Sequence, residues 1–341
     1  MPRARSSRAP CPVPRAPALP AMRILITGAG GQVGFEAARS LAGLGEILCA
    51  DRVADPALGI AHALDLADAE ALRAGVRALA PDVIVNAAAH TAVDAAEDEP
   101  ELADALNHRA VVVLADVARE RGALLLHYST DYVFGGDGRE PYREDHATAP
   151  KSVYGRSKLA GEQALAVSGC AFLLLRTAWV YAARGRNFLL TMLRAAAQRP
   201  ELTVVDDQVG CPTTARFLAD TTATLVRRWS QTDAAGRRAL EGACHVAGAG
   251  QVSWCGFARA IMVQAHALGL LPQATPVRAI ASSDYPAKAP RPAYSVLDTT
   301  RLRAVFGVTP PHWSQGLQQT LLELAEARRA LSATGFEVRR C

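Results

Sequence analysis

Short, nearly continuous runs of apolar residues recur along the chain and alternate with longer segments that carry apolar residues at helical spacing. Such runs predict strands that are buried on both faces, as in a parallel sheet. We expect strands at residues 23–27, 46–50, 82–86, 124–129, 172–177 and 244–247. The segments between them predict helices at residues 35–42, 69–79, 101–121, 154–167, 188–198 and 215–229.

This alternation weakens after about Tyr181, and proline-rich loops such as residues 285–292 interrupt it. Strands that alternate with helices are typical of a doubly wound sheet. We therefore predict an α/β fold: a Rossmann-type doubly wound parallel sheet with a smaller, noncontiguous substrate-binding lobe. The dinucleotide-binding domain is expected at residues 22–176, with about 213–250 returning to it, and the substrate-binding lobe at residues 177–212 and 251–330.

Both ends of the chain differ from this pattern. Residues 1–21 are rich in proline and arginine and have neither a periodic apolar pattern nor an apolar signal region. We expect a disordered extension or an upstream mis-start before Met22, with an organelle transit peptide as the third alternative. Residues 331–341 are expected to form a tail.

The first strand runs directly into a glycine-rich turn. The segment MRILITGAGGQVG at residues 22–34 has the GxxGxxG spacing that begins at Gly28, and a helix is expected to follow at about Gly31. Glycines allow a tight turn and a close approach to a pyrophosphate, and the free N–H groups of the helix face the anion. Asp51 follows Gly31 by 20 residues and can accept hydrogen bonds from an adenosine ribose, which favours NADH. Arg52 could instead hold a 2′-phosphate, so NADPH stays open.

Composition excludes several classes of protein. The 50% hydrophobic and 21% charged content is ordinary for a globular protein, and no apolar stretch approaches the roughly 18 residues that span a bilayer. The net charge of +4 equals the four arginines of residues 1–21, so we expect no nucleic-acid face. The seven cysteines form no CxxC pair and the eight histidines show no metal-binding spacing, so we predict a cytoplasmic protein without a bound metal.

The candidate chemistry follows two predicted strands. The segment NAAAHT at residues 86–91 ends one strand with small residues, which allow a cofactor to lie close. Ser129 and Thr130 end the next, and Tyr154 and Lys158 lie at positions i and i+4 on one face of a helix. We expect the ammonium to lower the pKa of the phenol, so that Tyr154 donates a proton while Thr130 polarises a carbonyl oxygen.

Together these segments resemble the extended short-chain dehydrogenases/reductases, and specifically the dTDP-4-dehydrorhamnose reductase family, from about residue 22 to residue 324. The resemblance rests on GQVG (31–34), PDVIVNAAAHTAVD (81–94), HYSTDYVF (127–134), VYGRSKLAGE (153–162), RTAWVY (176–181), NFLLTMLR (187–194) and DQVGCPT (207–213). It implies that the chain reduces the 4-keto group of a dTDP-linked 6-deoxy-L-hexulose to dTDP-L-rhamnose with NADPH or NADH.

The resemblance also implies roles for individual residues. Tyr154 is the proton donor, Lys158 holds the cofactor ribose, and Thr130 stabilises the developing alkoxide. The implied cofactor-binding residues are Gly28, Gly31, Gln32, Val33, Asp51, Arg52, Asp65, Leu66, Ala89, His90, Thr91, Tyr128, Tyr154 and Lys158. The implied substrate-binding residues are Thr130, Asp131, Trp179 and Arg291, with Arg176, Arg184 and Arg186 as further candidate diphosphate contacts.

The chain departs from the family in two respects, of which the first is the extension at residues 1–21 that the family pattern lacks. Some members dimerise through a magnesium ion held by carboxylates, and Glu36 matches one of these, but Gln198 and Gly307 stand at the other positions. This argues against a metal-bridged dimer. We expect a monomer or a weak homodimer, with Mg²⁺ as the alternative.

Related functions stay as alternatives. A 4,6-dehydratase carries a Thr-Asp-Glu triplet, where this chain has Tyr132 in third place. A reductase or epimerase of another nucleotide 4-ketosugar remains open, because the configuration at C4 depends on placement in the second lobe. A non-catalytic regulatory subunit of the same fold is the third alternative, and the intact Thr130, Tyr154 and Lys158 argue against it.

Overall fold

Seven parallel strands form the central sheet of the computed structural model, which describes residues 22–333. Their order is β11-β6-β5-β4-β1-β2-β3, and every neighbouring pair is parallel. The strands are β1 (Met22–Thr27), β2 (Gly45–Asp51), β3 (His62–Ala63), β4 (Val83–Asn86), β5 (Leu124–Thr130), β6 (Ala171–Thr177) and β11 (Gly242–His245). The side chains of β4 and β5 are buried throughout, as their apolar runs predicted.

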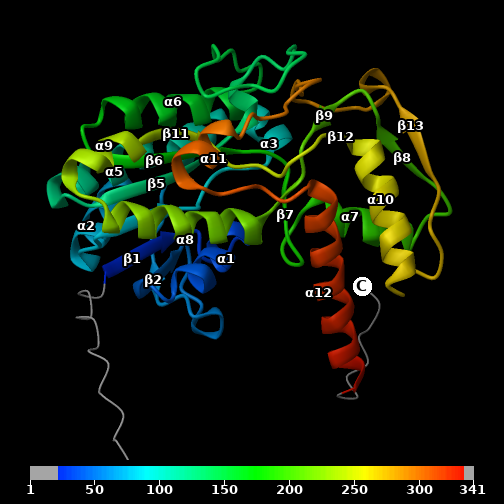
Figure 1. Ribbon diagram of the computed structural model, residues 1–341, viewed down its shortest axis with the longest axis horizontal. Coiled ribbons are helices and arrows are strands. Elements are labelled where there is room, and N and C mark those ends of the chain that lie inside the picture. Colours follow the sequence, from blue (N-terminus) through cyan, green and yellow to red (C-terminus); the bar gives the residue numbers. More distant parts are fainter. Residues whose placement is uncertain (1–21, 334–341) are drawn as a thin grey trace, which may run out of the picture.

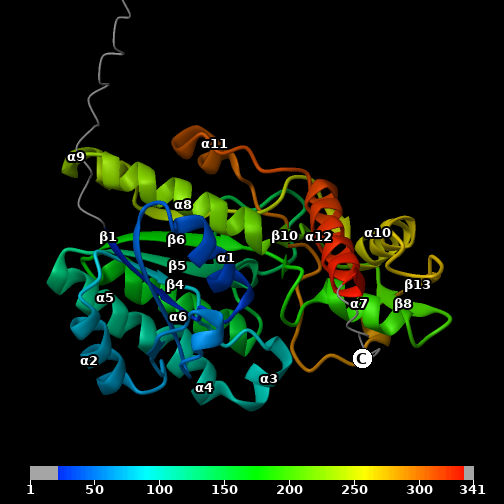
Figure 2. The same ribbon diagram turned by 90° about the horizontal axis from the view of Figure 1, so that it is seen from below.

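Helices cover both faces of this sheet (Figure 2). One face carries α1 (Gln32–Leu41), α8 (Ala215–Gln231) and α11 (Thr300–Phe306), which share a buried apolar cluster with β1, β4 and β5. The other carries α2 (Ala69–Leu79), α5 (Ala110–Arg121) and α6 (Val153–Val167), which contribute to a second cluster. The predicted Rossmann-type doubly wound sheet is therefore confirmed.

A second lobe lies beside the sheet (Figure 1). Its helices are α7 (Phe188–Ala196), α10 (Trp254–Ala267) and α12 (Trp313–Ala333). Three small sheets accompany them: β7 (Val180–Tyr181) with β10 (Thr213–Thr214), β8 (Leu202–Val205) with β13 (Val277–Ile280), and β9 (Val209–Gly210) with β12 (Val252–Ser253). Its apolar core gathers around Phe257, Leu189 and Leu317, which come from three distant segments.

The remaining elements are short. They are the helices α3 (Val93–Asp98), α4 (Pro100–Asp104) and α9 (Ala234–Leu240), the single helical turns Pro56–Leu58, Asp131–Val133 and Ser282–Asp284, and the π-helical turn Ala105–Arg109. Among residues 22–333, no helix is long and apolar enough to cross a membrane.

Several boundaries differ from the sequence-based expectation. α8 and β11 return to the first lobe as expected, but α11 also packs there, with Leu302 and Phe306 in the core of the sheet, although its position predicted the second lobe. The helix expected at residues 101–121 contains the π-helical turn, and the strand expected at residues 244–247 is β11, which begins and ends two residues earlier. The expected extension at residues 1–21 and most of the tail, residues 334–341, lie outside the described residues.

Candidate active site

A cleft of about 1010 Å³ opens at the carboxyl ends of the central strands and is lined by both lobes. This is the edge where doubly wound folds bind ligands. The site residues that the sequence predicted line the cleft, except His90 and two of the candidate diphosphate contacts, Arg176 and Arg184. We call the part around Gly28, Gly31 and Asp51 the cradle end, and the part around Thr130, Tyr154, Lys158, Trp179 and Trp254 the catalytic end.

Backbone geometry builds the cradle end. Gly28 has a φ of 68°, and a Cβ there would lie 2.7 Å from the backbone nitrogen of Ala88. Gly31 caps α1 without any side-chain hydrogen bond, so the first N–H groups of the helix are free for an anion. A Cβ on Gly34 would lie 2.1 Å from the carbonyl oxygen of Gly28, so only glycine lets the helix pack this closely on the turn. These residues fit the pyrophosphate of a dinucleotide.

Asp51 closes the far side of the cradle. Its Oδ2 accepts a hydrogen bond from the Gly30 nitrogen at 2.9 Å, and its Oδ1 accepts one from the Arg52 nitrogen at 2.7 Å. Each carboxylate oxygen keeps a second acceptor position, which suits a ribose hydroxyl. The Arg52 side chain is exposed at the cleft, and Asp65 and Leu66 line the same region.

The side chain of Gln32 joins the two lobes. Its Nε2 donates to the carbonyl oxygen of Arg186 at 3.4 Å, and its Oε1 accepts from Asn187 Nδ2 at 2.8 Å. The neighbouring Arg184 guanidinium lies 3.6 Å from the ring centroid of Phe35 on α1. The loop before α7 is thereby held against the N-terminal turn of α1, a contact that the sequence motif did not predict.

Tyr154 and Thr130 meet at the catalytic end. Tyr154 lies in the first turn of α6, where the hydroxyl of Ser152 caps the helix by accepting from the nitrogen of Gly155 at 3.0 Å. Thr130 ends β5, and its hydroxyl lies against the phenol. Burial raises the pKa of Tyr154 above its ordinary value, so the phenol is protonated at neutral pH.

Lys158 is oriented differently from the sequence-based expectation. Its Nζ donates to the carbonyl oxygen of Tyr128 at 2.6 Å and lies 3.0 Å from Nε2 of His127. Burial lowers the pKa of Lys158 to about 8. The expectation that this ammonium lowers the pKa of Tyr154 is wrong for the structure, because the ammonium contacts β5 and the desolvation of the phenol dominates.

Asp131 is a third buried titratable group beside the phenol. Its Oδ1 accepts a hydrogen bond from the Thr130 hydroxyl at 3.0 Å. Burial raises the pKa of Asp131 to about 6, against the opposing effect of the Ser295 and Thr130 hydroxyls. The catalytic end therefore places the Asp131 carboxyl and the Tyr154 phenol next to each other, and burial favours the uncharged form of both.

Two tryptophans form an aromatic wall on the second lobe. The indole of Trp179 stacks on that of Trp254, with ring centroids 3.4 Å apart and an interplanar angle of 5°. Trp179 has a φ of 50°, which is rare for a bulky residue and common at functional sites. A Cβ on Gly210 would lie 2.5 Å from the Trp179 ring, which explains the glycine at this position. The sequence did not predict Trp254 as a site residue, because no recognisable motif surrounds it.

Arg291 reaches the cleft from the proline-rich loop but carries an ion pair. Its NH2 lies 2.7 Å from Oδ2 of Asp94 on α3, and the nearby Lys288 pairs with Asp98 of the same helix. The loop of residues 285–292 is thereby tied to the first lobe. Arg176 has a structural role instead of the suggested diphosphate contact, since it is buried and pairs with Glu162 at 2.7 Å.

His90 does not line the cleft with the residues around it. Its Nε2 lies 3.0 Å from a carboxylate oxygen of Glu99, and its backbone nitrogen donates to Oδ1 of Asn107 at 2.9 Å. Asn107 also donates to the carbonyl oxygen of His90 and to Ser157 on α6. Asn107 lies in the π-helical turn, and it fixes the loop that follows β4, whose Ala89 and Thr91 do line the cleft.

Comparison with known proteins agrees with this geometry. The sequence profile of the RmlD substrate binding domain matches residues 22–326. A protein of Burkholderia thailandensis named dTDP-4-dehydrorhamnose reductase is 48% identical over 294 residues, covering 86% of this chain and 95% of that protein. The chain belongs to the dTDP-4-dehydrorhamnose reductase family.

Solved structures of this family have the same fold. The dTDP-4-dehydrorhamnose reductase of Clostridium acetobutylicum superposes with a TM-score of 0.79 at 33% identity, covering 89% of this chain and 99% of that one. The reductase of Bacillus anthracis, solved in complex with NADP, gives a TM-score of 0.78 at 32% identity with the same coverage.

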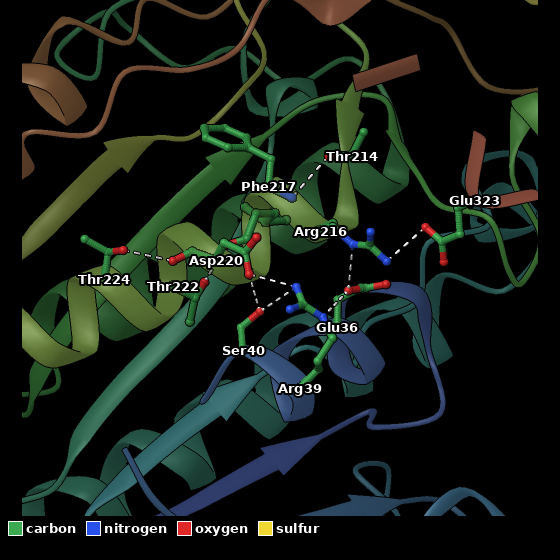
Figure 3. A network of polar contacts seen from close by, with 11 residues as sticks. Glu36, Arg39, Ser40, Thr214, Arg216, Phe217, Asp220, Thr222, Thr224 and Glu323 are labelled. Carbon is green, nitrogen blue, oxygen red and sulfur yellow. Dashed lines mark hydrogen bonds and ion pairs between the residues drawn. The ribbon is translucent and has the colours of Figure 1, made fainter. Parts of the chain in front are cut away.

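The magnesium site of some family members does not fit this chain. Figure 3 shows Glu36 on α1 facing the guanidinium groups of Arg39 and Arg216, at 3.0 and 3.5 Å, and Arg216 also pairs with Glu323 of α12. Two guanidinium groups thus already balance the buried carboxylate. No group of three or more metal-binding side chains occurs among residues 22–333. Gln198 is exposed and Gly307 ends α11 on the first lobe.

Proposed function

We propose that this protein reduces the 4-keto group of dTDP-4-dehydro-6-deoxy-L-mannose to give dTDP-L-rhamnose, with NADPH or NADH as the reductant. The observation that carries the proposal is one continuous cleft that joins a glycine-built phosphate cradle to the Thr130, Tyr154 and Lys158 constellation. Membership of the reductase family supports it, and so does the aromatic wall of Trp179 and Trp254.

The nicotinamide cofactor, when bound along the cradle, supplies the hydride for the C4 carbon of the sugar. Tyr154 is the proton donor for the ketone oxygen, and its raised pKa keeps the proton on the phenol until the oxygen becomes basic. The Thr130 hydroxyl, which donates to Asp131 in the structure, turns its single proton to the same oxygen when substrate binds and stabilises the negative charge that develops there. Lys158 holds the ribose next to the nicotinamide through the N–H that points away from β5.

The second lobe holds the substrate. We assign the hexose to the space between Tyr154 and the aromatic wall, where Asp131 contacts its hydroxyl groups. Arg186 and Arg291 also line the cleft. Arg186 has the more accessible charge for the diphosphate, because Arg291 is paired with Asp94.

The choice of cofactor depends on two neighbouring residues. Asp51 accepts hydrogen bonds from an adenosine ribose and repels a 2′-phosphate, whereas the exposed Arg52 attracts that phosphate. We propose that both NADH and NADPH are used. The protein acts in the cytoplasm as a monomer or weak homodimer, and the free state of Cys49, Cys170, Cys211, Cys244 and Cys255 agrees with a reducing compartment.

The decisive experiment combines the purified protein with the 4-keto dTDP sugar and either cofactor. We expect oxidation of NADH and NADPH at 340 nm in step with the appearance of dTDP-L-rhamnose, identified by the proton couplings at C4 in the NMR spectrum. A dTDP product with the opposite C4 configuration would identify a reductase for a different sugar. Absence of turnover with this substrate would contradict the proposal.

A further inference from the structure

A line of buried polar side chains runs beneath the cleft, across three neighbouring strands. Lys158 Nζ lies 3.0 Å from His127 Nε2, and His127 Nδ1 lies 3.0 Å from the Asn86 amide nitrogen. The hydroxyl of Thr27 lies 2.7 Å from Asn86 Oδ1. Strand register places these groups side by side, because Thr27 pairs with Asn86 on β4 and Asn86 pairs with His127 on β5. None of the four side chains is more than 2% exposed.

The protons of this line have to satisfy simple hydrogen-bonding rules. A neutral imidazole has one N–H donor and one acceptor nitrogen. His127 therefore cannot accept from the Lys158 ammonium and from the Asn86 amide at the same time. Either the lysine is neutral and accepts from Nε2–H, or the Asn86 amide presents its oxygen to Nδ1–H and its nitrogen to Thr27.

We propose that His127 is a positioning residue for Lys158, neutral and in the Nδ1–H form, which accepts from the ammonium at Nε2 and donates to the amide oxygen of Asn86. The amide nitrogen of Asn86 then donates to the Thr27 hydroxyl. His127 and the carbonyl oxygen of Tyr128 use two of the three ammonium protons. The third is directed into the cleft, where the cofactor ribose lies under the proposed function on which this inference rests.

The surrounding charges favour this assignment. Burial and the neighbouring ammonium lower the pKa of His127 well below its ordinary value, so the imidazole is uncharged at neutral pH. Burial lowers the pKa of Lys158 to about 8, which still leaves the ammonium mostly charged at neutral pH. Glu162 on α6 favours the charged form, and its carboxylate is itself paired with Arg176 of β6. No other charged group influences the lysine appreciably within the described residues. The line ends at Thr27, which is fully buried, so its inner end has no contact with solvent.

Three variants test the proposal. His127→Leu removes the acceptor, His127→Gln carries an amide oxygen that can reach the position of Nε2, and His245→Leu is the matched control. His245 is an equally buried histidine on β11, hydrogen-bonded to the carbonyl oxygen of Asp298 and absent from the cleft. Thermal denaturation of all three measures the general cost of replacing a buried imidazole.

Cofactor binding is the first readout, measured by the fluorescence of NADH without any sugar. We expect His127→Leu to weaken binding roughly tenfold, because hydrogen bonds to charged groups contribute that much. His127→Gln should restore most of the loss, and His245→Leu should not weaken binding. Equal affinities of wild type and His127→Leu, or equal losses in His127→Leu and His245→Leu, would overturn the proposal.

The pH dependence of cofactor binding is the second readout. Loss of the acceptor disfavours the charged ammonium, so the alkaline decline in affinity should move to lower pH in His127→Leu and return toward the wild-type position in His127→Gln. An unchanged alkaline limb in a folded His127→Leu would contradict the proposal.

Nitrogen-15 NMR of the wild-type protein gives a third readout that needs no variant. We expect the His127 ring to show a protonated Nδ1 and an unprotonated Nε2. A protonated Nε2 would overturn the proposal, even if His127→Leu failed to fold. Because none of these measurements uses a sugar substrate, failure of the reductase assay would leave their outcome intact.

Discussion

The two ends of the cleft are built in different ways. At the cradle end, one short segment shapes the site through its backbone: Gly28 and Gly34 allow close packing of the turn, and Gly31 leaves the first N–H groups of α1 free. At the catalytic end, side chains from β5, α6, β6–β7 and α10 converge, and Trp179 meets Trp254 from a segment 75 residues away. A site made of contiguous backbone is encoded in residue spacing, whereas a site made of convergent side chains depends on how the lobes pack.

Burial also differs between the two ends. Asp51 and Arg52 stand at the partly exposed margin of the cradle, where ordinary hydrogen bonds to the backbone suffice. Tyr154, Asp131 and Lys158 are almost completely buried, and desolvation favours the uncharged form of each. The buried titratable groups are thereby concentrated at the catalytic end of the cleft.

The largest effect that separates the two ends is expected from Tyr154→Phe. It removes the proton donor and keeps the ring, so turnover should fall by about 100-fold or more while the affinity for NADH stays within about twofold. Steady-state kinetics and fluorescence titration measure the two quantities. Near-normal turnover of the purified variant would show that another group protonates the substrate.

Two glycine substitutions should separate cofactor binding at the cradle end from sugar binding at the catalytic end. In Gly28→Ala, the new Cβ meets the Ala88 backbone at a positive φ, so the Kd for the cofactor should rise roughly tenfold or more. In Gly210→Ala, the Cβ displaces the indole of Trp179, so the KM for the sugar should rise to a similar degree.

Gly122→Ala is the control for these two substitutions. Gly122 ends α5 at a φ of 67°, far from the cleft and with open space for a Cβ. It should lower stability while leaving the Kd and the KM unchanged. If Gly210→Ala weakened cofactor binding as strongly as sugar binding, the proposed division of the cleft would be wrong.

Asp131→Asn should make the protein more stable at pH 7. Burial raises the pKa of Asp131 from 3.8 to about 6, so the charged carboxylate destabilises the fold above that pH by on the order of 3 kcal/mol. The uncharged amide avoids this cost, and its advantage should disappear as the pH falls below about 4, where the carboxyl is protonated in both states. Urea unfolding at pH 4 and pH 7 measures the free energy of unfolding of variant and wild type. If the variant differed from the wild type equally at both pH values, the buried charge of Asp131 would not be the cause.

Substitutions at the margin of the cradle should change cofactor preference by several-fold. Asp51→Ala deletes a ribose acceptor and relieves repulsion of a 2′-phosphate, so it should weaken NADH more than NADPH. Arg52→Ala should have the opposite effect and weaken the binding of NADPH more than that of NADH. The ratio of kcat/KM for the two cofactors is the measurement, and an unchanged ratio in both variants would place these side chains outside the adenosine site.

The smallest expected effect is that of magnesium. Because Arg39 and Arg216 already balance the charge of Glu36, neither excess EDTA nor added Mg²⁺ should change the activity or the mass of the protein in solution. Sedimentation analysis with and without the ion tests this. A magnesium-dependent dimer would show that the guanidinium groups move aside for the metal.

Much of the first lobe could be predicted from the sequence because its elements are locally encoded. The helix at residues 69–79 has the bounds that the periodicity predicted, and β1, β2 and β5 differ by a residue or less at either end. The second lobe was predicted as a region but not as elements: α10 and α12 were not foreseen. Their apolar faces are buried only by packing against α7 and against each other, since the core around Phe257 is assembled from distant segments.

The amino-acid sequence by itself determined the cradle, the positions of the first strands along the chain and the placement of Tyr154 and Lys158 on one helix face, because each follows from local spacing in the sequence. Tertiary structure decided which way the Lys158 ammonium turns, that Trp254 completes the aromatic wall and that Arg291 is bound to Asp94. Burial decided the protonation of Tyr154, since desolvation depends on every atom packed around the phenol and not on its neighbours in the chain.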